Sequence, residues 1–199
     1  MSVTETTICN GALGFLSDGP ITSLQDASEQ ARLCNEHYPV ARRLALQLHD
    51  WKFATRRALL NRLSVAPAFG YLYQYALPTG YLSTYETHPV DLVYVMESNP
   101  DTGAEVMLTD YETPGLVYSC DIEDSNRFSP LFVATLELVL AVRLCMVITE
   151  KRDLKLSLNQ ELTEMLMQAK KRDAKQNPAR QTIPVEMDLV RRSVAALWE

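Results

Sequence analysis

The sequence predicts an α+β protein in which helices from both ends of the chain form a bundle, with an antiparallel β-sheet inserted along the chain between them. Three observations lead to this prediction. Residues 27–49 carry apolar side chains at helical spacing, residues 51–121 are rich in tyrosine and β-branched residues, and residues 131–174 return to helical spacing. We therefore expect a helical bundle from residues 1–50 and 124–176, a sheet domain at 51–123, and an extended C-terminal arm at 177–199.

Length and composition are those of a globular protein. The chain has 199 residues, of which 47% are hydrophobic and 22% charged, enough for one domain with a smaller one inserted. A net charge of -6 argues against a general nucleic-acid binder, which needs a basic face. The four cysteines include no Cys-x-x-Cys pair, so we expect reduced, buried thiols and a reducing compartment. The first residues are polar and acidic, unlike a signal peptide.

Two helices are predicted before the sheet. The first covers residues 3–16, and Ser2 and Glu5 have the spacing of a capping box. The second has Asp26 as its N-cap and runs from residue 27 to about residue 49. Pro39 lies inside it, which predicts either a kink at residues 36–38 or two collinear helices. Arg42, Arg43 and Gln47 lie off the apolar stripe of this helix, which consists of Cys34, Tyr38, Ala41, Leu44, Ala45 and Leu48.

The period of the sequence changes after this helix. Trp51 and Phe53 alternate with Lys52 and Ala54, as in a strand. A hairpin turn is expected at Asn99–Gly103. The candidate strands are residues 51–60, 80–87, 91–97, 105–108 and 116–120.

Two helices are predicted after the sheet. Ser129 and Pro130 have the pattern of an N-cap followed by the first helical residue. Residues 131–149 are then apolar almost all round, which is typical of a central core helix or of a membrane span. Glu137 and Arg143 would each cost about 2.5–3.5 kcal/mol at a bilayer centre. We therefore predict a buried helix of a soluble protein, followed by a last helix over residues 150–174.

Residues 177–199 combine apolar side chains with no clear period. Such a segment is typical of an arm that packs on a partner. The alternative is a terminus that packs loosely on its own domain.

The sequence offers few candidates for chemistry. No phosphate-binding glycine loop, dinucleotide fingerprint, zinc-protease motif or nucleophile elbow is present. Cys34 and His37, one helical turn apart, could supply half a zinc site with Cys9 nearby, or a nucleophile and its base. A core histidine is the preferred interpretation. Asp121, Glu123 and Asp124 could bind a cation, but we expect a solvated loop. Residues 71–85 are tyrosine-rich and lack arginine and lysine, which favours core or subunit packing over stacking on bases.

Five short motifs resemble the head-to-tail adaptor family of tailed phages, whose members in short-tailed phages are called tail tubular protein A. The resemblance covers roughly residues 3–150. The motifs are Ile8-Cys9-Asn10-x-Ala12-Leu13, Tyr38-Pro39-x-x-Arg42-Arg43-x-x-Leu46, His49-x-Trp51-x-Phe53-Ala54, Tyr75-Ala76-Leu77-Pro78 and Phe128-x-Pro130-x-Phe132.

The resemblance implies a structural virion protein with no catalytic site, no cofactor and no bound metal. Such a protein would assemble in the host cytoplasm as a homo-oligomeric ring, usually of twelve subunits, between the portal protein and a tail nozzle protein similar to tail tubular protein B. The ring would extend the channel for DNA ejection, so genomic DNA would pass through its lumen without sequence-specific binding and no membrane would be involved.

The resemblance also implies roles for parts of this chain. The sheet domain would face the tail and the C-terminal arm would reach the portal. The expected portal contacts are Ile183, Val185, Met187, Leu189 and Trp198. The expected structural residues of the junction between helices and sheet are Tyr38, Pro39, Trp51, Phe53, Tyr75 and Pro78.

Two other functions stay open on the residues alone. One is a cellular helix-bundle module for protein interaction, which would form a compact closed oligomer by itself. The other is a hydrolase that uses Cys34 and His37.

Overall fold

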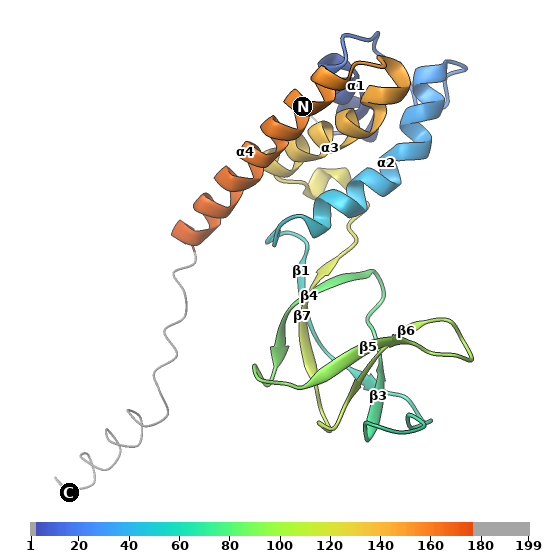
Figure 1. The fold of residues 1–199 in the computed structure, drawn as a ribbon, viewed down its shortest axis with the longest axis vertical. Coiled ribbons are helices and arrows are strands. Elements are labelled where there is room, and N and C mark those ends of the chain that lie inside the picture. Colours follow the sequence, from blue (N-terminus) through green and yellow to red (C-terminus); the bar gives the residue numbers. More distant parts are fainter. Residues whose placement is uncertain (1–2, 177–199) are drawn as a thin grey trace, which may run out of the picture. The chain divides into compact units, whose positions relative to one another are not determined.

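The computed structural model describes residues 3–176, with side chains described as far as residue 172. Within these residues the fold combines four α-helices with two antiparallel β-sheets (Figure 1), which confirms the predicted α+β class. The predicted C-terminal arm and its expected portal contacts lie outside the described residues. The chain up to Leu166 belongs to one compact unit, and the packing described below is that of this unit.

Helix α1 (Glu5–Phe15) begins two residues later than the predicted capping pair requires. Thr4 is the N-cap, and its hydroxyl accepts a hydrogen bond from the backbone N–H of Thr7 at 3.1 Å. The hydroxyl of Thr7 accepts in return from the backbone N–H of Thr4 at 2.9 Å. The expectation of a Ser2–Glu5 capping box was therefore wrong, because Thr4 and Thr7 form the capping box of this helix.

Helix α2 (Glu29–Gln47) is one uninterrupted helix through Pro39, so the prediction of two collinear helices was wrong. Its N-cap is Ser28, whose hydroxyl accepts from the backbone N–H of Ala31 at 3.2 Å. Asp26, the predicted N-cap, instead accepts hydrogen bonds within the preceding loop. The side chain of an aspartate can accept hydrogen bonds from backbone N–H groups of a loop as readily as from those at the start of a helix, which explains the error.

The buried face of α2 also differs from the predicted stripe. Tyr38, Ala41 and Ala45 are buried as predicted, but Leu44 is 39% exposed. Arg42, which the periodicity left outside the stripe, is only 4% exposed. The face is therefore rotated toward Arg42, because that side chain has a partner in Asp121, directly after the last strand.

Helix α3 (Pro130–Ile148) is the central helix of the three that pack together. Its N-cap is Ser129, as predicted, with the hydroxyl accepting from the backbone N–H of Phe132 at 3.3 Å. It contacts both α1 and α2. Helix α4 (Arg152–Gln176) follows after a short turn. The buried side chains of α3 are Phe132, Thr135, Leu136, Leu138, Val139, Leu140, Ala141, Leu144 and Cys145.

The strands form two antiparallel sheets where one was predicted. The first has the order β1 (Thr55–Leu59), β7 (Gly115–Cys120), β4 (Tyr81–His88). The second has the order β2 (Asn61–Arg62), β3 (Tyr73–Ala76), β6 (Glu105–Thr109), β5 (Tyr94–Ser98).

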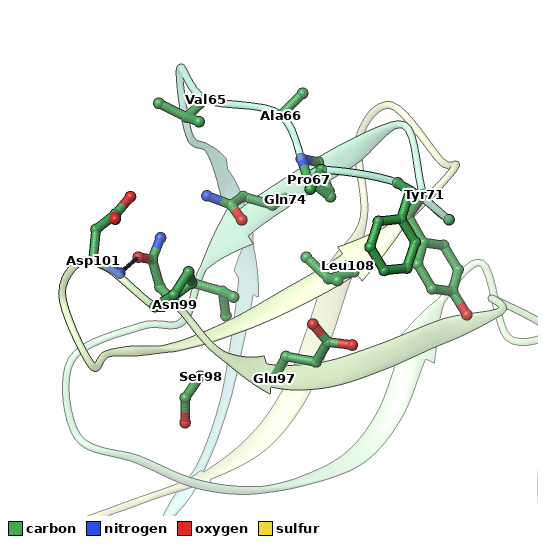
Figure 2. Close-up of a pocket in the computed structure, with 15 residues that line it drawn as sticks. Val65, Ala66, Pro67, Tyr71, Gln74, Glu97, Ser98, Asn99, Asp101 and Leu108 are labelled. Carbon is green, nitrogen blue, oxygen red and sulfur yellow. Dashed lines mark hydrogen bonds between the residues drawn. The ribbon is translucent and has the colours of Figure 1, made fainter.

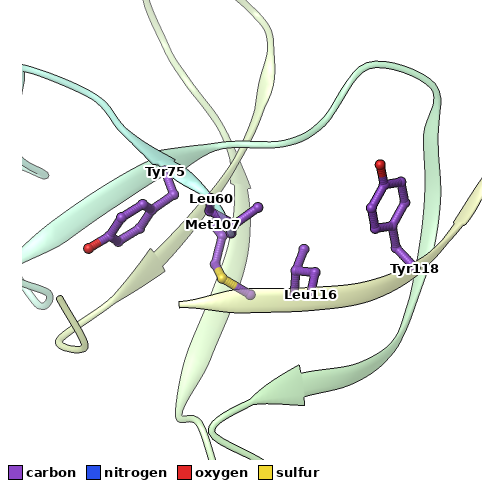
Figure 3. Packing of buried hydrophobic residues seen from close by; sticks show 5 residues of the cluster. All are labelled: Leu60, Tyr75, Met107, Leu116 and Tyr118. Atoms are coloured by element: carbon purple, nitrogen blue, oxygen red, sulfur yellow. The ribbon is translucent and has the colours of Figure 1, made fainter. Parts of the chain in front are cut away.

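One hydrophobic cluster joins the two sheets. Leu116 and Tyr118 come from β7, whereas Tyr75 and Met107 come from β3 and β6 of the other sheet. Leu60 lies between β1 and β2, where the chain passes from one sheet to the other (Figure 3). The two sheets therefore share a hydrophobic core whose residues all come from the segment between α2 and α3.

The passage at Leu60 explains why the number of sheets was mispredicted. Its backbone N–H bonds to the carbonyl of Pro114 at 2.9 Å, and pairing then switches from β7 to β3. Residues 51–54 form a turn, so the strand predicted from residue 51 begins only at Thr55. Strands β2 and β3 were missed. The predicted hairpin turn is confirmed: Gly103 has φ 69° and its N–H bonds to the Asn99 carbonyl at 2.8 Å.

Candidate functional site

Two charged side chains connect α2 to the end of β7. The guanidinium of Arg42 donates from Nε and Nη2 to the two carboxylate oxygens of Asp121, each at 3.0 Å. The side chains are 5% and 12% exposed. Arg43 adds a second cation, with Nε 3.0 Å from the same carboxylate. Burial, the largest single influence, disfavours the charged form of Arg42, but the hydrogen bonds to Asp121 and the negative charges of Asp121 and Glu123 together outweigh it and raise the pKa of Arg42.

Glu123 and Asp124, which follow Asp121, complete this part of the chain. Glu123 lies 3.3 Å from Nη2 of Arg42 and is 77% exposed, whereas Asp124 accepts from the backbone N–H of Asn126 and caps a short 3₁₀ helix (Ser125–Arg127). The expectation of a solvated carboxylate loop is therefore wrong for Asp121. The cation that it binds is a guanidinium of the same chain.

An aromatic cluster lies at the same junction. The ring centroids of Trp51 and Phe132 are 5.1 Å apart, those of Phe53 and Phe132 5.0 Å, and those of Phe128 and Phe132 4.7 Å. The indole N–H of Trp51 donates to the backbone carbonyl of Ala45 at 2.8 Å. Aromatic pairs at these distances add to the free energy gained by burying the rings. The cluster therefore fixes the chain where α2 ends and the sheets begin.

Backbone and side-chain hydrogen bonds cross the junction as well. The N–H of Cys120 bonds to the carbonyl of Ala54 at 2.9 Å. The side-chain amide of Gln47 donates to the carbonyl of Leu82 at 3.0 Å. With the Arg42–Asp121 pair and the aromatic rings, these bonds hold α2 against β4 and β7.

The remaining junction residues of the sequence analysis have different environments. Tyr38 is buried, and its hydroxyl has no hydrogen-bond partner within the described part of the chain. Pro39 is exposed on α2. Tyr75 lies in the shared core of the sheets, where its hydroxyl contacts the carbonyls of Tyr111 and Glu112 at 2.9 and 2.7 Å.

Pro78 and Asn10 fix loops near these elements. The carbonyl of Pro78 accepts from the N–H of Tyr81 in the turn before β4. The side chain of Asn10 bonds both backbone groups of Ile21, at 2.9 and 2.8 Å, and so holds the loop between α1 and α2. Periodicity gives no signal for such a role. Only the folded structure, in which the Asn10 amide pairs with the backbone of Ile21, shows that Asn10 has this role.

The cysteine and histidine candidates lie in different environments. Cys9 and Cys34 are both fully buried, and their thiols interact with each other. This interaction raises the pKa of Cys9, as burial also does, and lowers the pKa of Cys34, so the pair resists losing both protons. His37 is half-buried. Among the described residues no group of three or more metal-ligating side chains comes together.

Exposed apolar side chains are frequent in the sheets and their loops. Leu72 precedes β3, Val93 precedes β5 and Tyr111 follows β6, with exposed fractions of 62%, 74% and 42%. The strand register pairs both Tyr73 and Tyr94 with Thr109. Leu72, Val93 and Tyr111, which lie one or two residues beyond these paired positions, are therefore at the same end of the four-stranded sheet. We call Leu72, Val93 and Tyr111 the apolar rim. Exposed apolar side chains gathered at one end of a sheet are candidates for an interaction site.

Helix α3 has the length and the mean hydropathy, 2.4, of a membrane span. Half of this apolar segment is buried inside the protein. Its contacts with α1 and α2 are those of a core helix.

No model of a known protein family matches the chain, and the search of curated proteins found no match either.

Proposed function

We propose that this protein is a structural component of a phage virion, a head-to-tail adaptor that forms a ring between the portal and the tail nozzle. The observation that supports the proposal is the convergence of three adaptor-like motifs on one junction. Tyr38-Pro39-x-x-Arg42-Arg43 supplies the ion pairs, and His49-x-Trp51-x-Phe53-Ala54 and Phe128-x-Pro130-x-Phe132 supply the aromatic cluster.

A junction of this kind suits a structural subunit that must hold its helices and sheets in a fixed arrangement and that catalyses no reaction. The helices and the sheets each have a core, and buried ion pairs and rings fasten one to the other. A ring subunit needs such stiffness because every lateral contact repeats around the ring and small errors accumulate. The helices from both ends of the chain would act as one bundle, with residues 177–199 as an extended arm.

The partners follow from this arrangement. The arm, through Ile183, Val185, Met187, Leu189 and Trp198, would contact the portal protein. The apolar rim would contact the nozzle protein, since it is a cluster of exposed apolar side chains on the sheets. A chain with a net charge of -6 would let genomic DNA pass through a dodecameric ring without holding it. No enzyme activity, cofactor or membrane contact is part of the proposal, and the mature location is the head–tail junction of the virion.

The test is to purify the full chain alone and together with the portal protein encoded near it, and to measure masses by light scattering and ring formation by negative-stain microscopy. We expect a monomer that becomes a ring on the portal. A chain that ignores the portal, or that closes into a small oligomer alone, would overturn the proposal and favour a cellular interaction module.

Variants separate the two partners. Deleting residues 178–199 should abolish portal binding, and unchanged binding would remove the arm from the proposal. Replacing Leu72, Val93 and Tyr111 by serine should weaken nozzle binding and leave portal binding intact. The matched control replaces three exposed apolar residues of the helices, Val40, Val147 and Leu156, by serine. Equal loss in both triple variants would argue against the apolar rim.

A further inference from the structure

A cleft lies on the face of the four-stranded sheet that is turned away from the shared core. Residues 65–71, between β2 and β3, pass over this face and enclose a volume of about 400 Å³ with the sheet and the hairpin turn at Asn99–Asp101 (Figure 2). This volume is in the range of sites that hold a small ligand or a few residues of a peptide.

The floor of the cleft is mainly apolar. Val106 and Leu108 of β6 line it, and they point to the opposite side of the strand from Met107, which lies in the shared core. Both side chains are at most 5% exposed, because residues 65–71 cover them. An apolar side chain inserted beside them would lose its contact with water.

One polar side chain of the floor lacks a partner. Gln74 of β3 is 8% exposed as a whole, and its amide end makes no hydrogen bond within residues 3–172 but still reaches water in the cleft. In Figure 2 its amide end is directed to the side of the cleft where Asn99 and Asp101 lie. A carboxamide can donate and accept at once, and a ligand that covers it must replace the hydrogen bonds that it makes to water. Its natural complement is a peptide group, which also has one donor and one acceptor.

The edge of the cleft carries two acidic side chains. Glu97 and Asp101 line it, no lysine or arginine is among the lining residues, and their carboxylates form no ion pair within the described chain. Phe69, 88% exposed, and Val65, 64% exposed, extend the apolar surface beyond the floor. Such an edge attracts a cation, and its apolar extension suits a ligand longer than a single small molecule.

We infer that this cleft binds an extended segment of a partner protein that presents an aliphatic side chain directly followed by arginine or lysine. The aliphatic side chain packs between residues 65–71 and Val106, the peptide group pairs with the amide of Gln74, and the cation lies beside Glu97 and Asp101. The site is independent of the adaptor role, since none of its residues belongs to the junction or to the apolar rim.

The experiment is a ¹⁵N NMR titration of the full chain with two capped peptides, acetyl-Ala-Leu-Arg-Ala-amide and acetyl-Ala-Leu-Glu-Ala-amide. We expect the arginine peptide to shift the Gln74 side-chain amide and residues 65–71 with a dissociation constant of about 1–10 mM, and the glutamate peptide to bind at least about tenfold more weakly. No shift with either peptide, equal affinities, or shifts confined to other surfaces would overturn the inference.

Variants test the two recognition elements separately. Glu97→Gln with Asp101→Asn should remove the preference for the arginine peptide, whereas the control pair Glu86→Gln with Asp91→Asn, both exposed and outside the cleft, should retain it. Gln74→Leu should weaken binding of the arginine peptide about fivefold or more without lowering the melting temperature, because it removes an amide that makes no hydrogen bond within the described chain. An unchanged affinity in Gln74→Leu would show that this amide does not contact the peptide.

Discussion

The guanidinium of Arg42 and the carboxylate of Asp121 meet in a bidentate ion pair between α2 and the end of β7, two parts of the chain that lie 79 residues apart. Neither side chain has much contact with water, and the same carboxylate also accepts from Arg43, whose side chain is 60% exposed. One carboxylate therefore holds a buried and an exposed cation. This arrangement allows their contributions to be compared directly.

Removing the buried cation should cost far more than removing the exposed one. Arg42→Gln is expected to lower the free energy of unfolding by about 3–5 kcal/mol, because it leaves Asp121 poorly paired in a site that excludes water. Arg43→Gln should cost less than about 1 kcal/mol, since exposed ion pairs contribute little. Urea denaturation followed by circular dichroism measures both. Similar losses in the two variants would contradict the burial of the Arg42 pair.

The indole N–H of Trp51 is predicted to stabilise the junction separately from the ring. Trp51→Phe keeps an aromatic ring beside Phe132 but leaves the Ala45 carbonyl without its donor, which should cost about 1–2 kcal/mol. Trp51→Ala should cost about 3–5 kcal/mol, because it also leaves a cavity. Both are measured by chemical denaturation. Equal losses would mean that the hydrogen bond dominates, and the aromatic cluster would then have no role in stability.

The hydroxyl of Tyr75 is predicted to hold the loop after β6. Tyr75→Phe should cost about 1–2 kcal/mol, because two carbonyls lose their donor next to a side chain that is 1% exposed. Tyr111→Phe is the matched control: its ring is 42% exposed, so the loss should stay below about 0.5 kcal/mol. Thermal unfolding of the two variants in parallel makes the comparison, and a control as damaging as the test would refute the prediction.

Glu137 of α3 is predicted to make stability depend on pH. A Cβ at Gly11 of α1 would lie 2.4 Å from the Glu137 carboxyl carbon, so α1 covers this side chain closely. Burial raises the pKa of Glu137 above its usual 4.5. Below pH 4.5 the carboxyl is protonated in both the folded and the unfolded protein and costs nothing. As the pH rises from 4.5 to the raised folded pKa, the unfolded state releases the proton first, so stability is lost.

Glu137→Gln should therefore raise the melting temperature at pH 7, by on the order of a few degrees, and the gain should vanish below about pH 4.5. Glu161→Gln removes a charge from an exposed position of α4 and should leave the melting temperature nearly unchanged at both pH values. Melting curves at pH 4 and pH 7 decide. A gain from Glu137→Gln that persists at pH 4 would assign it to packing and not to the buried charge.

Local signals were sufficient for much of the fold. The Ser129–Pro130 start of α3 and the Asn99–Gly103 turn depend on hydrogen bonds between residues a few positions apart, so the sequence determined them by itself. The α+β class followed from the change of period after residue 50, which reflects how side chains alternate on a strand and rotate around a helix.

Only the tertiary structure decided where the chain changes sheets and which polar groups are buried. The switch at Leu60 depends on the carbonyl of Pro114, and the burial of Arg42 depends on Asp121, both supplied by distant parts of the chain. Periodicity counts apolar residues and so places a charged residue outside the core. A buried charge becomes favourable only when a partner from elsewhere compensates for its lost hydration, and that partner exists only once the chain has folded.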